Sequence, residues 1–336
     1  MRDPGKLTPA GAPVTVATGV GAVVIGRNEG QRLVACLASL AGSVDRVVYV
    51  DSGSTDDSIA NARAVGATVV PLDLTRPFTA ARARNEGFAA LGPVAYAQFV
   101  DGDCELRPDW IATARAFLDA HPDVAVACGR RRERAPEASV YNRLCDREWD
   151  TPVGEARACG GDSLMRAGAV VAVGGFRESL IAGEEPELCL RLRAKGWKIR
   201  RLDAEMTLHD AAITRLGQWW RRTRRAGFAF AEGAALHGAP PERHWVRETR
   251  RALIWGLALP VAALGIGLLF SPLGLLLLLA YPAQVVRMAA RGGIGDRAAW
   301  EFAFFGVLGK FPEMLGVLEY RIGVLLGRRA GLIEYK

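Results

Sequence analysis

The stretch "YAQFVDGDCEL", Tyr96 to Leu106, starts as an apolar run and ends on Asp101 and Asp103, two aspartates one residue apart. Residues two apart on an extended chain point the same way, so these carboxylates would converge and repel. A divalent cation would relieve the repulsion, and Mg²⁺ favours one or two protein carboxylates together with substrate phosphates. A solvated Asp-Gly-Asp turn around Gly102 explains the same residues equally well. The stretch alone leaves both interpretations open.

Apolar runs of strand length alternate with helical patterns on both sides of this stretch. We predict strands at 20–26, 46–51, 67–73, 94–100 and 124–129, and helices at 31–40, 56–66, 79–91 and 109–122. The second helix has Ser54 or Thr55 as its expected cap. A less regular part follows, with a strand, a short helix and a Gly turn at 160–176, a helix at 184–196 and a strand at 197–203. This alternation predicts an α/β fold with a mostly parallel sheet covered by helices.

Polar residues follow the predicted strands at the point where each strand ends. Glu29 comes after the first strand, Asp51 ends the second, and Asp101 and Asp103 end the fourth. Open sheets of this type bind ligands at the carboxyl ends of their strands. The sequence therefore predicts a ligand site at that edge of the sheet.

A second acidic group, Glu184, Glu185 and Glu187, opens the helix of "GEEPELCLRLRAKG". Acids at a helix N-terminus compensate the helix dipole, which explains part of the pattern. Three acids in four positions exceed that need. Crowded carboxylates have a raised proton affinity, which suits a general base.

The apolar excess of the chain lies near its C-terminus, where no charged residue occurs from Ala252 to Val286. One straight helix of that length would measure about 50 Å, too long for a hydrocarbon core of about 30 Å. We therefore predict a helical hairpin at 253–286 with its bend near Pro272. Arginines flank both ends and none lies at the bend, which puts both ends on the cytoplasmic side. A buried helical hairpin in a soluble domain is the alternative.

The segment 298–329 is apolar but punctuated by charges, which predicts amphipathic helices lying in the membrane interface. The formal charge is +7, and Trp219 and Trp220 precede the basic run "RRTRR". Tryptophan beside arginine favours a membrane surface over nucleic acid as partner. We expect a loose tail at 1–18, a catalytic domain at 19–245 and a membrane-associated helical region at 246–336. Six scattered cysteines without a CxxC pair predict free thiols.

Six motifs, in order, carry a resemblance to a known family: "VVIGRNEG", "VVYVDSGSTDDS", "ARARNEGFAAL", "FVDGDCEL", "GGDSLMRAGAVVAVGGF" and "GEEPELCLRLRAKGWKI". Over about Val20 to Asp210, the chain resembles a family 2 glycosyltransferase. The resemblance implies the GT-A fold of nucleotide-diphospho-sugar transferases and an inverting reaction assisted by Mg²⁺ or Mn²⁺.

The resemblance also assigns roles to matching positions. It implies donor nucleotide contacts at Glu29, Asp51, Arg84, Asn85 and Asp101, metal ligands at Asp103, Asp101 and His209, catalytic residues at Glu185 and Glu184, and acceptor contacts at Gly161, Asp162 and Glu187. The family has Asp where this chain has Glu185, one methylene longer, so Glu184 and Glu187 stay candidates for the base. A structural, hydrogen-bonded histidine explains His209 equally well.

We therefore expect a membrane-associated enzyme that moves a sugar from a nucleotide-diphospho-sugar to a lipid-linked or cell-envelope saccharide. We expect it at the inner membrane, with its catalytic domain on the cytoplasmic side. Transfer to a polyprenyl phosphate is an alternative, although a phosphate acceptor needs no general base. An inactive scaffold for envelope assembly is a third interpretation, against which the intact acidic residues argue.

Overall fold

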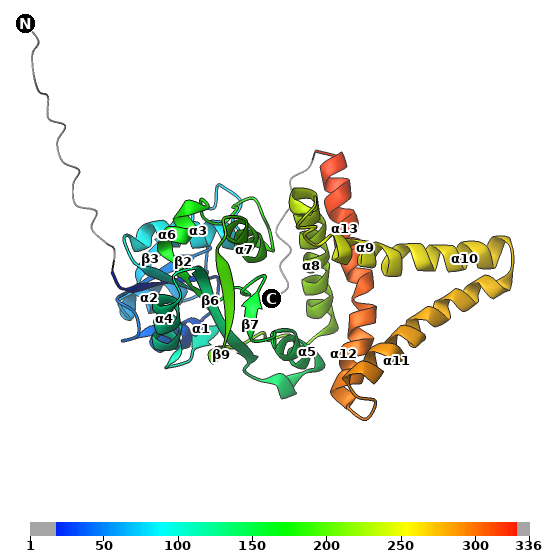
Figure 1. Cartoon of the computed structure of the whole chain (residues 1–336), viewed down its shortest axis with the longest axis horizontal. Coiled ribbons are helices and arrows are strands. Elements are labelled where there is room, and N and C mark those ends of the chain that lie inside the picture. Colours follow the sequence, from blue (N-terminus) through cyan, green and yellow to red (C-terminus); the bar gives the residue numbers. More distant parts are fainter. Residues whose placement is uncertain (1–17, 328–336) are drawn as a thin grey trace, which may run out of the picture.

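The structure is a computed structural model that describes residues 18–327, and it consists of an α/β body and a helical C-terminal region (Figure 1). The predicted tail at 1–18 lies outside the described residues, apart from its last position, and so does the end of the chain from 328 on. Nine strands form one sheet in the body. They are β1 (Val20–Gly26), β2 (Arg46–Asp51), β3 (Thr68–Pro71), β4 (Tyr96–Asp101), β5 (Cys104–Leu106), β6 (Val124–Glu133), β7 (Gly154–Ala156), β8 (Ser163–Arg166) and β9 (Lys198–His209).

The sheet has a parallel half and a mixed half. Its order is β3-β2-β1-β4-β8-β6-β9-β5, with β7 paired to β9. All pairs from β3 to β4 are parallel, whereas β8 runs antiparallel to both β4 and β6. The α/β class is confirmed, but the sheet is mixed rather than mostly parallel, because β5, β7 and β8 all pair in the antiparallel sense.

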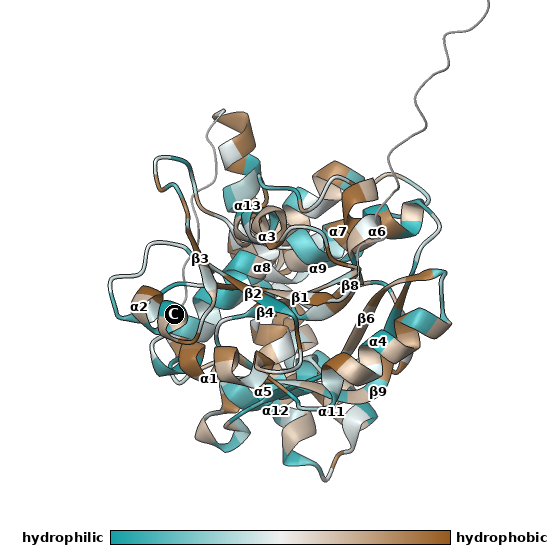
Figure 2. Cartoon of the chain, turned by 90° about the vertical axis from the view of Figure 1, so that its left-hand side faces the viewer, coloured by the Kyte–Doolittle hydropathy of each residue, from teal (hydrophilic) through white to brown (hydrophobic). Residues whose placement is uncertain are grey.

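Helices cover both faces of this sheet. The body helices are α1 (Gln31–Leu40), α2 (Ser58–Ala64), α3 (Ala80–Leu91), α4 (Trp110–Ala120), α5 (Val140–Glu148), α6 (Ala167–Ala172) and α7 (Glu184–Ala194). Seen from the side, α3, α6 and α7 lie on one face of the sheet and α1 and α4 on the other (Figure 2). α1 has the predicted bounds and buries the apolar stripe Leu33, Cys36, Leu37 and Leu40.

Local chemistry explains how α3 sits on the parallel half. Thr79 caps it, because its hydroxyl accepts from the backbone N–H of Arg82 at 3.1 Å. Gly87 lets the helix approach the sheet, since a Cβ there would lie 2.4 Å from a methyl of Val23 and 2.7 Å from one of Val50. The predicted cap of α2 is wrong: the helix begins after Asp57, and neither Ser54 nor Thr55 caps it.

The C-terminal region begins with α8 (Leu216–His237), which packs along α13 (Lys310–Leu325). Their backbones touch at two glycines. A Cβ on Gly227 would lie 2.0 Å from the carbonyl oxygen of Glu313, and one on Gly316 would lie 2.0 Å from that of Arg224. Such close approach fixes α13 against α8, so α13 is a packed helix rather than one that lies only in an interface.

Two apolar helical stretches project from this base as a hairpin (Figure 1). The first contains α9 (Val246–Leu253), a π-helical turn (Ile254–Ala258) and α10 (Leu259–Leu269). The second contains a 3₁₀ segment (Pro272–Leu279) and α11 (Ala280–Gly292), and α12 (Arg297–Leu308) then leads back. The stretches Val246–Leu269 and Pro272–Gly292 are long and apolar enough to cross a membrane, and little of either is buried within the protein.

Candidate active site

A pocket of about 510 Å³ opens at the edge of the sheet where β1, β4 and β9 end. Loops after these strands meet the start of α7 and one side chain of α8 there. The lining residues are Ile25, Gly26, Arg27, Asn28, Glu29, Arg32, Ser52, Phe78, Ala80, Arg84, Asp101, Gly102, Asp103, Glu184, His209 and Arg225. Glu29, Arg84, Asp101, Asp103, Glu184 and His209, six of the residues expected from the sequence, therefore share one cavity.

Arg84 joins two carboxylates of the pocket. Its guanidinium donates to Oδ1 of Asp101 at 2.7 Å and to Oε1 of Glu184 at 2.5 Å. The side chain is only 3% exposed. Burial alone would lower the pKa of Arg84, but the adjacent Asp101 and Glu184 carboxylates raise it above its usual value. The residue is therefore a fixed cation that holds the end of β4 against the start of α7.

Asp101 is also held from its other side. Its backbone N–H donates to Oδ1 of the fully buried Asp162 at 3.1 Å. Arg131, which the sequence did not indicate, lies 2.8 Å from Oδ2 of Asp162 and 3.9 Å from Oδ2 of Asp101. Gly161 has φ +72° and packs so closely that a Cβ would lie 2.7 Å from Arg131. Gly161 and Asp162 thus support Asp101 from behind and do not line the pocket.

Asp103 and His209 lie close to each other in another part of the pocket. Oδ2 of Asp103 lies 3.4 Å from Nε2 of His209. Oε2 of the buried Glu133 lies 3.9 Å from the second ring nitrogen, and the ring of Trp149 meets the imidazole edge-on. Carboxylate oxygen and imidazole nitrogen are ordinary ligands of divalent metals. The donor set and its position beside pocket arginines fit a metal that carries a phosphate group.

The loops after β1 and β2 are joined by hydrogen bonds. Oδ1 of Asn28, at φ 55°, accepts from the N–H of Thr55 at 2.7 Å, while the N–H of Asn28 donates to the hydroxyl of Ser54 at 2.9 Å. Asp51 is buried and accepts from the Tyr49 hydroxyl and from the N–H groups of Gly53 and Ser54. Its carboxylate therefore shapes the loop and does not line the pocket.

Glu184 and Glu185 differ sharply in their surroundings. Glu184 lines the pocket, whereas Glu185 is 5% exposed and turns inward. Oε1 of Glu185 accepts from the N–H of Cys159 at 2.5 Å and from the thiol of Cys189 at 3.1 Å. The two sulfurs lie 3.6 Å apart, and burial raises the pKa of the Cys159 thiol. Adjacent residues at the start of α7 thus point one carboxylate into the pocket and one into the core.

Glu187 lies outside the pocket and in a basic environment. It is 1% exposed and pairs with Arg191, Arg177 and His237. Burial alone would raise the pKa of Glu187, but these partners, Arg191 foremost, lower it. The expected raised proton affinity of this acidic group is therefore wrong for Glu187, because the sequence did not show which cations fold against it.

Asn85 is another expected residue that lies off the pocket. Its side chain exchanges two hydrogen bonds of 2.8 Å with the backbone of Phe176. It therefore fastens α3 to the loop that leads toward α7.

The basic run of α8 also differs from its expected membrane role. Arg225 lines the pocket and donates to the carbonyl of Ile181 at 2.7 Å. Arg222 pairs with Glu148 and Arg224 with Glu319. Trp219 is buried against Tyr141 and Phe305 and so does not lie at a membrane surface. These arginines pair with residues far away along the chain, so the local sequence did not indicate their partners.

Comparison with known proteins agrees with this geometry. The family model "Glycosyl transferase family 2" matches residues 22–159. A pre-mycofactocin glycosyltransferase of Mycobacterium tuberculosis is 28% identical over 225 residues, which cover 63% of this chain and 46% of that protein. A TPR repeat-containing protein of Synechococcus elongatus is 32% identical over 121 residues, covering 36% and 29%. The chain thus spans half or less of the length of these curated relatives.

A solved structure supports the fold. The mannosyltransferase PcManGT from Pyrobaculum calidifontis, in complex with GDP-Man and Mn²⁺, superposes with a TM-score of 0.59 at 17% identity, over 91% of this chain and 89% of that one. Because the superposition covers 91% of this chain, it includes C-terminal helices as well as the α/β body. Residues 22–159 thus match the family 2 glycosyltransferase model, and the chain has a GT-A-like fold.

Proposed function

We propose that this protein transfers a sugar from a nucleotide-diphospho-sugar to a hydroxyl group of a lipid-linked or cell-envelope saccharide, with inversion at the anomeric carbon. One observation carries the proposal. A single pocket at the strand ends combines Asp103 and His209, a pair suited to a metal, with Glu184, a candidate base, and with arginines suited to phosphates.

The relatives support a nucleotide-sugar donor. A glycosyltransferase acting on a mycofactocin precursor and a mannosyltransferase complexed with GDP-Man both resemble this chain. In our proposal Glu29 and Asp101 contact the nucleoside, and Arg27 and Arg225 face its diphosphate. Asp51, Asn85 and Arg84 act as positioning residues, because their polar groups hold loops and helices of the pocket.

Asp103 and His209 would hold Mg²⁺ or Mn²⁺, with Asp101 beside them. When bound, the metal would neutralise the charge that develops on the departing diphosphate. Glu133 lies 3.9 Å behind the imidazole of His209, too far for a hydrogen bond, and adds an acidic group to this side of the pocket.

The base is one of the two glutamates at the start of α7. The acceptor oxygen forms its bond to the anomeric carbon while the bond from that carbon to the diphosphate oxygen breaks, and the acceptor proton passes to a carboxylate. Glu184 already lines the pocket, whereas Glu185 would have to leave the Cys159 N–H to reach it. We propose that Gly161 and Asp162 fix the acceptor side through Asp101.

We further propose that the hairpin lies in the inner membrane with the catalytic domain on the cytoplasmic side. Large apolar side chains at its tip support this, since Leu268 and Phe270 are 82% and 83% exposed. Basic residues flank both feet, including Arg250, Arg251, Arg287 and Arg291.

Transfer to a polyprenyl phosphate is the second candidate. The observation that favours it is that both glutamates already have strong donors, Arg84 for Glu184 and Cys159 N–H for Glu185. A phosphate acceptor is already an anion and needs no base.

The test is sugar transfer by the full chain in detergent, with UDP-, GDP- and dTDP-sugars, Mg²⁺ or Mn²⁺, and a membrane lipid extract. We expect Asp103→Asn to lose roughly 100- to 1000-fold in metal-dependent transfer. Glu184→Gln should lose roughly 100- to 10,000-fold if Glu184 is the base, with Glu185→Gln much less affected. Asp109→Asn, at an exposed acid that does not line the pocket, is the matched control.

Each other outcome has a definite meaning. The reverse order of the two glutamate variants makes Glu185 the base. Full activity of both variants on a polyprenyl phosphate replaces the first candidate with the second. Failure to bind any donor with either metal would contradict both candidates and leave the inactive scaffold.

A further inference from the structure

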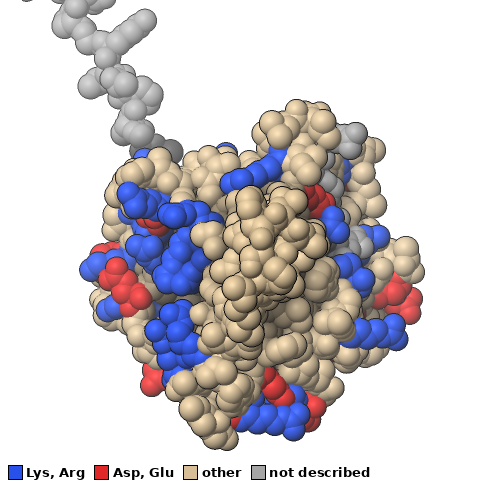
Figure 3. Space-filling model, turned by 90° about the vertical axis from the view of Figure 1, so that its right-hand side faces the viewer, with Lys and Arg blue, Asp and Glu red and all other residues tan. Residues whose placement is uncertain are grey.

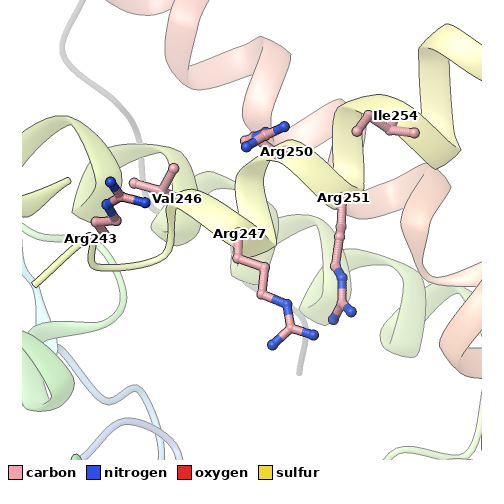
Figure 4. Close-up of a pocket in the computed structure, with 6 residues that line it drawn as sticks. All are labelled: Arg243, Val246, Arg247, Arg250, Arg251 and Ile254. Carbon is pink, nitrogen blue, oxygen red and sulfur yellow. The ribbon is translucent and has the colours of Figure 1, made fainter. Parts of the chain in front are cut away.

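A second hollow, of about 280 Å³, lies at the foot of the hairpin, away from the active-site pocket (Figure 4). We call it the arginine groove; it is lined by Arg243, Val246, Arg247, Arg250, Arg251 and Ile254. Arg250 and Arg251 of α9 follow Arg247 by three and four residues, and Ile254, the first residue of the π-helical turn, follows it by seven. This spacing puts them on one helical face. The side chains of Arg247 and Arg251 point the same way from the helix (Figure 4).

In the described part of the chain, the charges of the groove have no salt-bridge partner. All four arginines are exposed, and within residues 18–327 none forms a salt bridge. The nearby Glu242 is already paired with Arg193 at 2.7 Å. Four guanidinium groups around one hollow repel each other unless an anion enters it. A guanidinium is also the side chain best shaped for two hydrogen bonds to one phosphate.

The groove lies where a membrane surface would be. The apolar part of the first stretch starts at Ala252, directly after Arg251, and exposed large side chains such as Leu257 and Val261 follow. At about 1.5 Å per residue, Leu257 lies about 9 Å beyond Arg251. The headgroup layer on one side of a bilayer is about 5–8 Å thick. Lys and Arg gather beside the apolar projection on the face from which it extends (Figure 3).

The groove is firmly attached to the body. Trp245, which precedes α9, stacks on His244 at 4.2 Å and meets Phe230 edge-on at 5.3 Å. Gly183, the residue before Glu184, leaves room for this indole, since a Cβ there would lie 2.5 Å from its ring. The foot of the hairpin is therefore anchored to the start of α7, and an occupied groove would set the orientation of the active site to the bilayer.

We propose that the arginine groove binds the phosphate of an anionic phospholipid headgroup of the bilayer. The inference rests on the membrane association proposed above, but not on glycosyl transfer. A phospholipid fits better than the acceptor lipid, because the groove and the active-site pocket share no lining residue and the groove opens beside the apolar hairpin.

The test is lipid binding by the full chain in a neutral detergent, measured by native mass spectrometry. The probes are dihexanoyl-phosphatidylglycerol, dihexanoyl-phosphatidylcholine, farnesyl phosphate and inorganic phosphate. The variant is Arg247→Gln with Arg251→Gln. The matched control, Arg63→Gln with Arg107→Gln, removes the same charge from exposed arginines elsewhere. Donor hydrolysis and incorporation into nanodiscs are measured in parallel.

We expect phosphatidylglycerol to bind tightest, and the groove variant to weaken that binding roughly 30-fold, at about fivefold per arginine. The control variant should bind phosphatidylglycerol as the wild type does. The groove variant should keep wild-type donor hydrolysis and nanodisc incorporation. Equal binding by variant and wild type overturns the proposal, as does equal weakening by the control. If farnesyl phosphate binds more tightly than phosphatidylglycerol, the groove is an acceptor site. If inorganic phosphate binds as tightly as phosphatidylglycerol, the groove is a free-phosphate site. Either result overturns the proposal. A chain that enters no nanodisc would refute the membrane association itself, while unchanged donor hydrolysis would leave the enzyme proposal standing.

Discussion

Arginines gather at two places in this molecule, and the two differ in what neutralises them. In the active-site pocket Arg84 lies between Asp101 and Glu184, at 2.7 and 2.5 Å, and is almost wholly buried. In the arginine groove Arg247 and Arg251 are exposed and have no salt bridge to any residue of the described range. Similar side chains therefore serve opposite purposes in the two regions.

The difference follows from solvation. A buried guanidinium without partners would lose its hydration at a cost of several kcal/mol, so the fold must supply carboxylates to it. Those carboxylates then have fixed positions, which is what a site that orients a donor and an acceptor needs. An exposed guanidinium keeps its water until an external anion replaces it. The pocket is thus built in advance, whereas we propose that the groove is completed by the phosphate that it binds.

The largest effect that would sharpen this comparison is expected at Arg84. Arg84→Gln leaves Asp101 and Glu184 without their shared cation, so we expect a loss of about 3–5 kcal/mol in the free energy of unfolding. Arg84→Lys should recover only part of the lost free energy of unfolding, because an ammonium group cannot contact both carboxylates as the forked guanidinium does. Chemical denaturation in detergent measures both variants.

Arg32→Gln is the matched control for Arg84. Its guanidinium pairs with Glu29 at 2.8 Å in the same pocket, but the side chain is 29% exposed. We expect it to cost less than about 1 kcal/mol. An equal loss at Arg32 and Arg84 would contradict the idea that burial makes the Arg84 pair a structural constraint.

A smaller effect is expected where the two regions are joined. Gly227→Ala places a methyl group 2.0 Å from the carbonyl oxygen of Glu313, so α8 and α13 must move apart. We expect a loss of about 1–3 kcal/mol in the free energy of unfolding. Gly265→Ala, in α10, is the control, because a Cβ there meets nothing within 4 Å. It should stabilise slightly, since Ala favours helix over Gly. Thermal unfolding of the two variants compares the close contact between α8 and α13 with an open position on α10.

The part of this fold that could be predicted from the sequence is the part that depends on neighbours along the chain. The period of apolar residues gave α1 its bounds, and the apolar run before Asp101 predicted β4. The rule that ligands bind at strand carboxyl ends predicted one site for Glu29, Asp51, Asp101 and Asp103, and all of them except Asp51 line the pocket. β5, with three residues, is too short to show a periodic pattern.

What could not be predicted depends on contacts between distant residues. Arg84 and Glu184 are 100 positions apart, and Arg225 reaches the pocket only because α8 folds back. The mixed half of the sheet follows from β8, which lies antiparallel between β4 and β6 without a local sequence signal of its direction. For the same reason Glu185 and Glu187, two residues apart, have unlike partners: a backbone N–H and a thiol for the first, arginines and a histidine for the second.

The smallest effect is expected at a carboxyl group on α8 that neither region neutralises. Burial raises the pKa of Glu232 to about 7, against the lowering effect of Arg177, and its Oε2 atom is buried without a hydrogen-bond partner. The raised pKa means that the folded protein binds this proton more tightly than the unfolded chain, whose value is 4.5. The stabilising contribution is therefore complete below pH 4.5 and is lost as the pH rises through 7.

Glu232→Gln, which stays neutral, should accordingly be more stable than the wild type at pH 8 and equal to it near pH 4.5. The shift corresponds to about 3 kcal/mol at full strength, but the side chain is partly exposed, so solvent screening reduces the expected difference to about 1 kcal/mol, or about 2–4 °C in Tm. Glu137→Gln, at an exposed acid, should show no such dependence. An offset in Tm that is the same at both pH values would mean that packing, not charge, distinguishes the variant. If the offset grows with pH, Glu232 is the opposite case to Arg84. The fold supplies carboxylates to the buried Arg84 cation, but it supplies no hydrogen-bond partner to Oε2 of Glu232, so burial favours the neutral acid there.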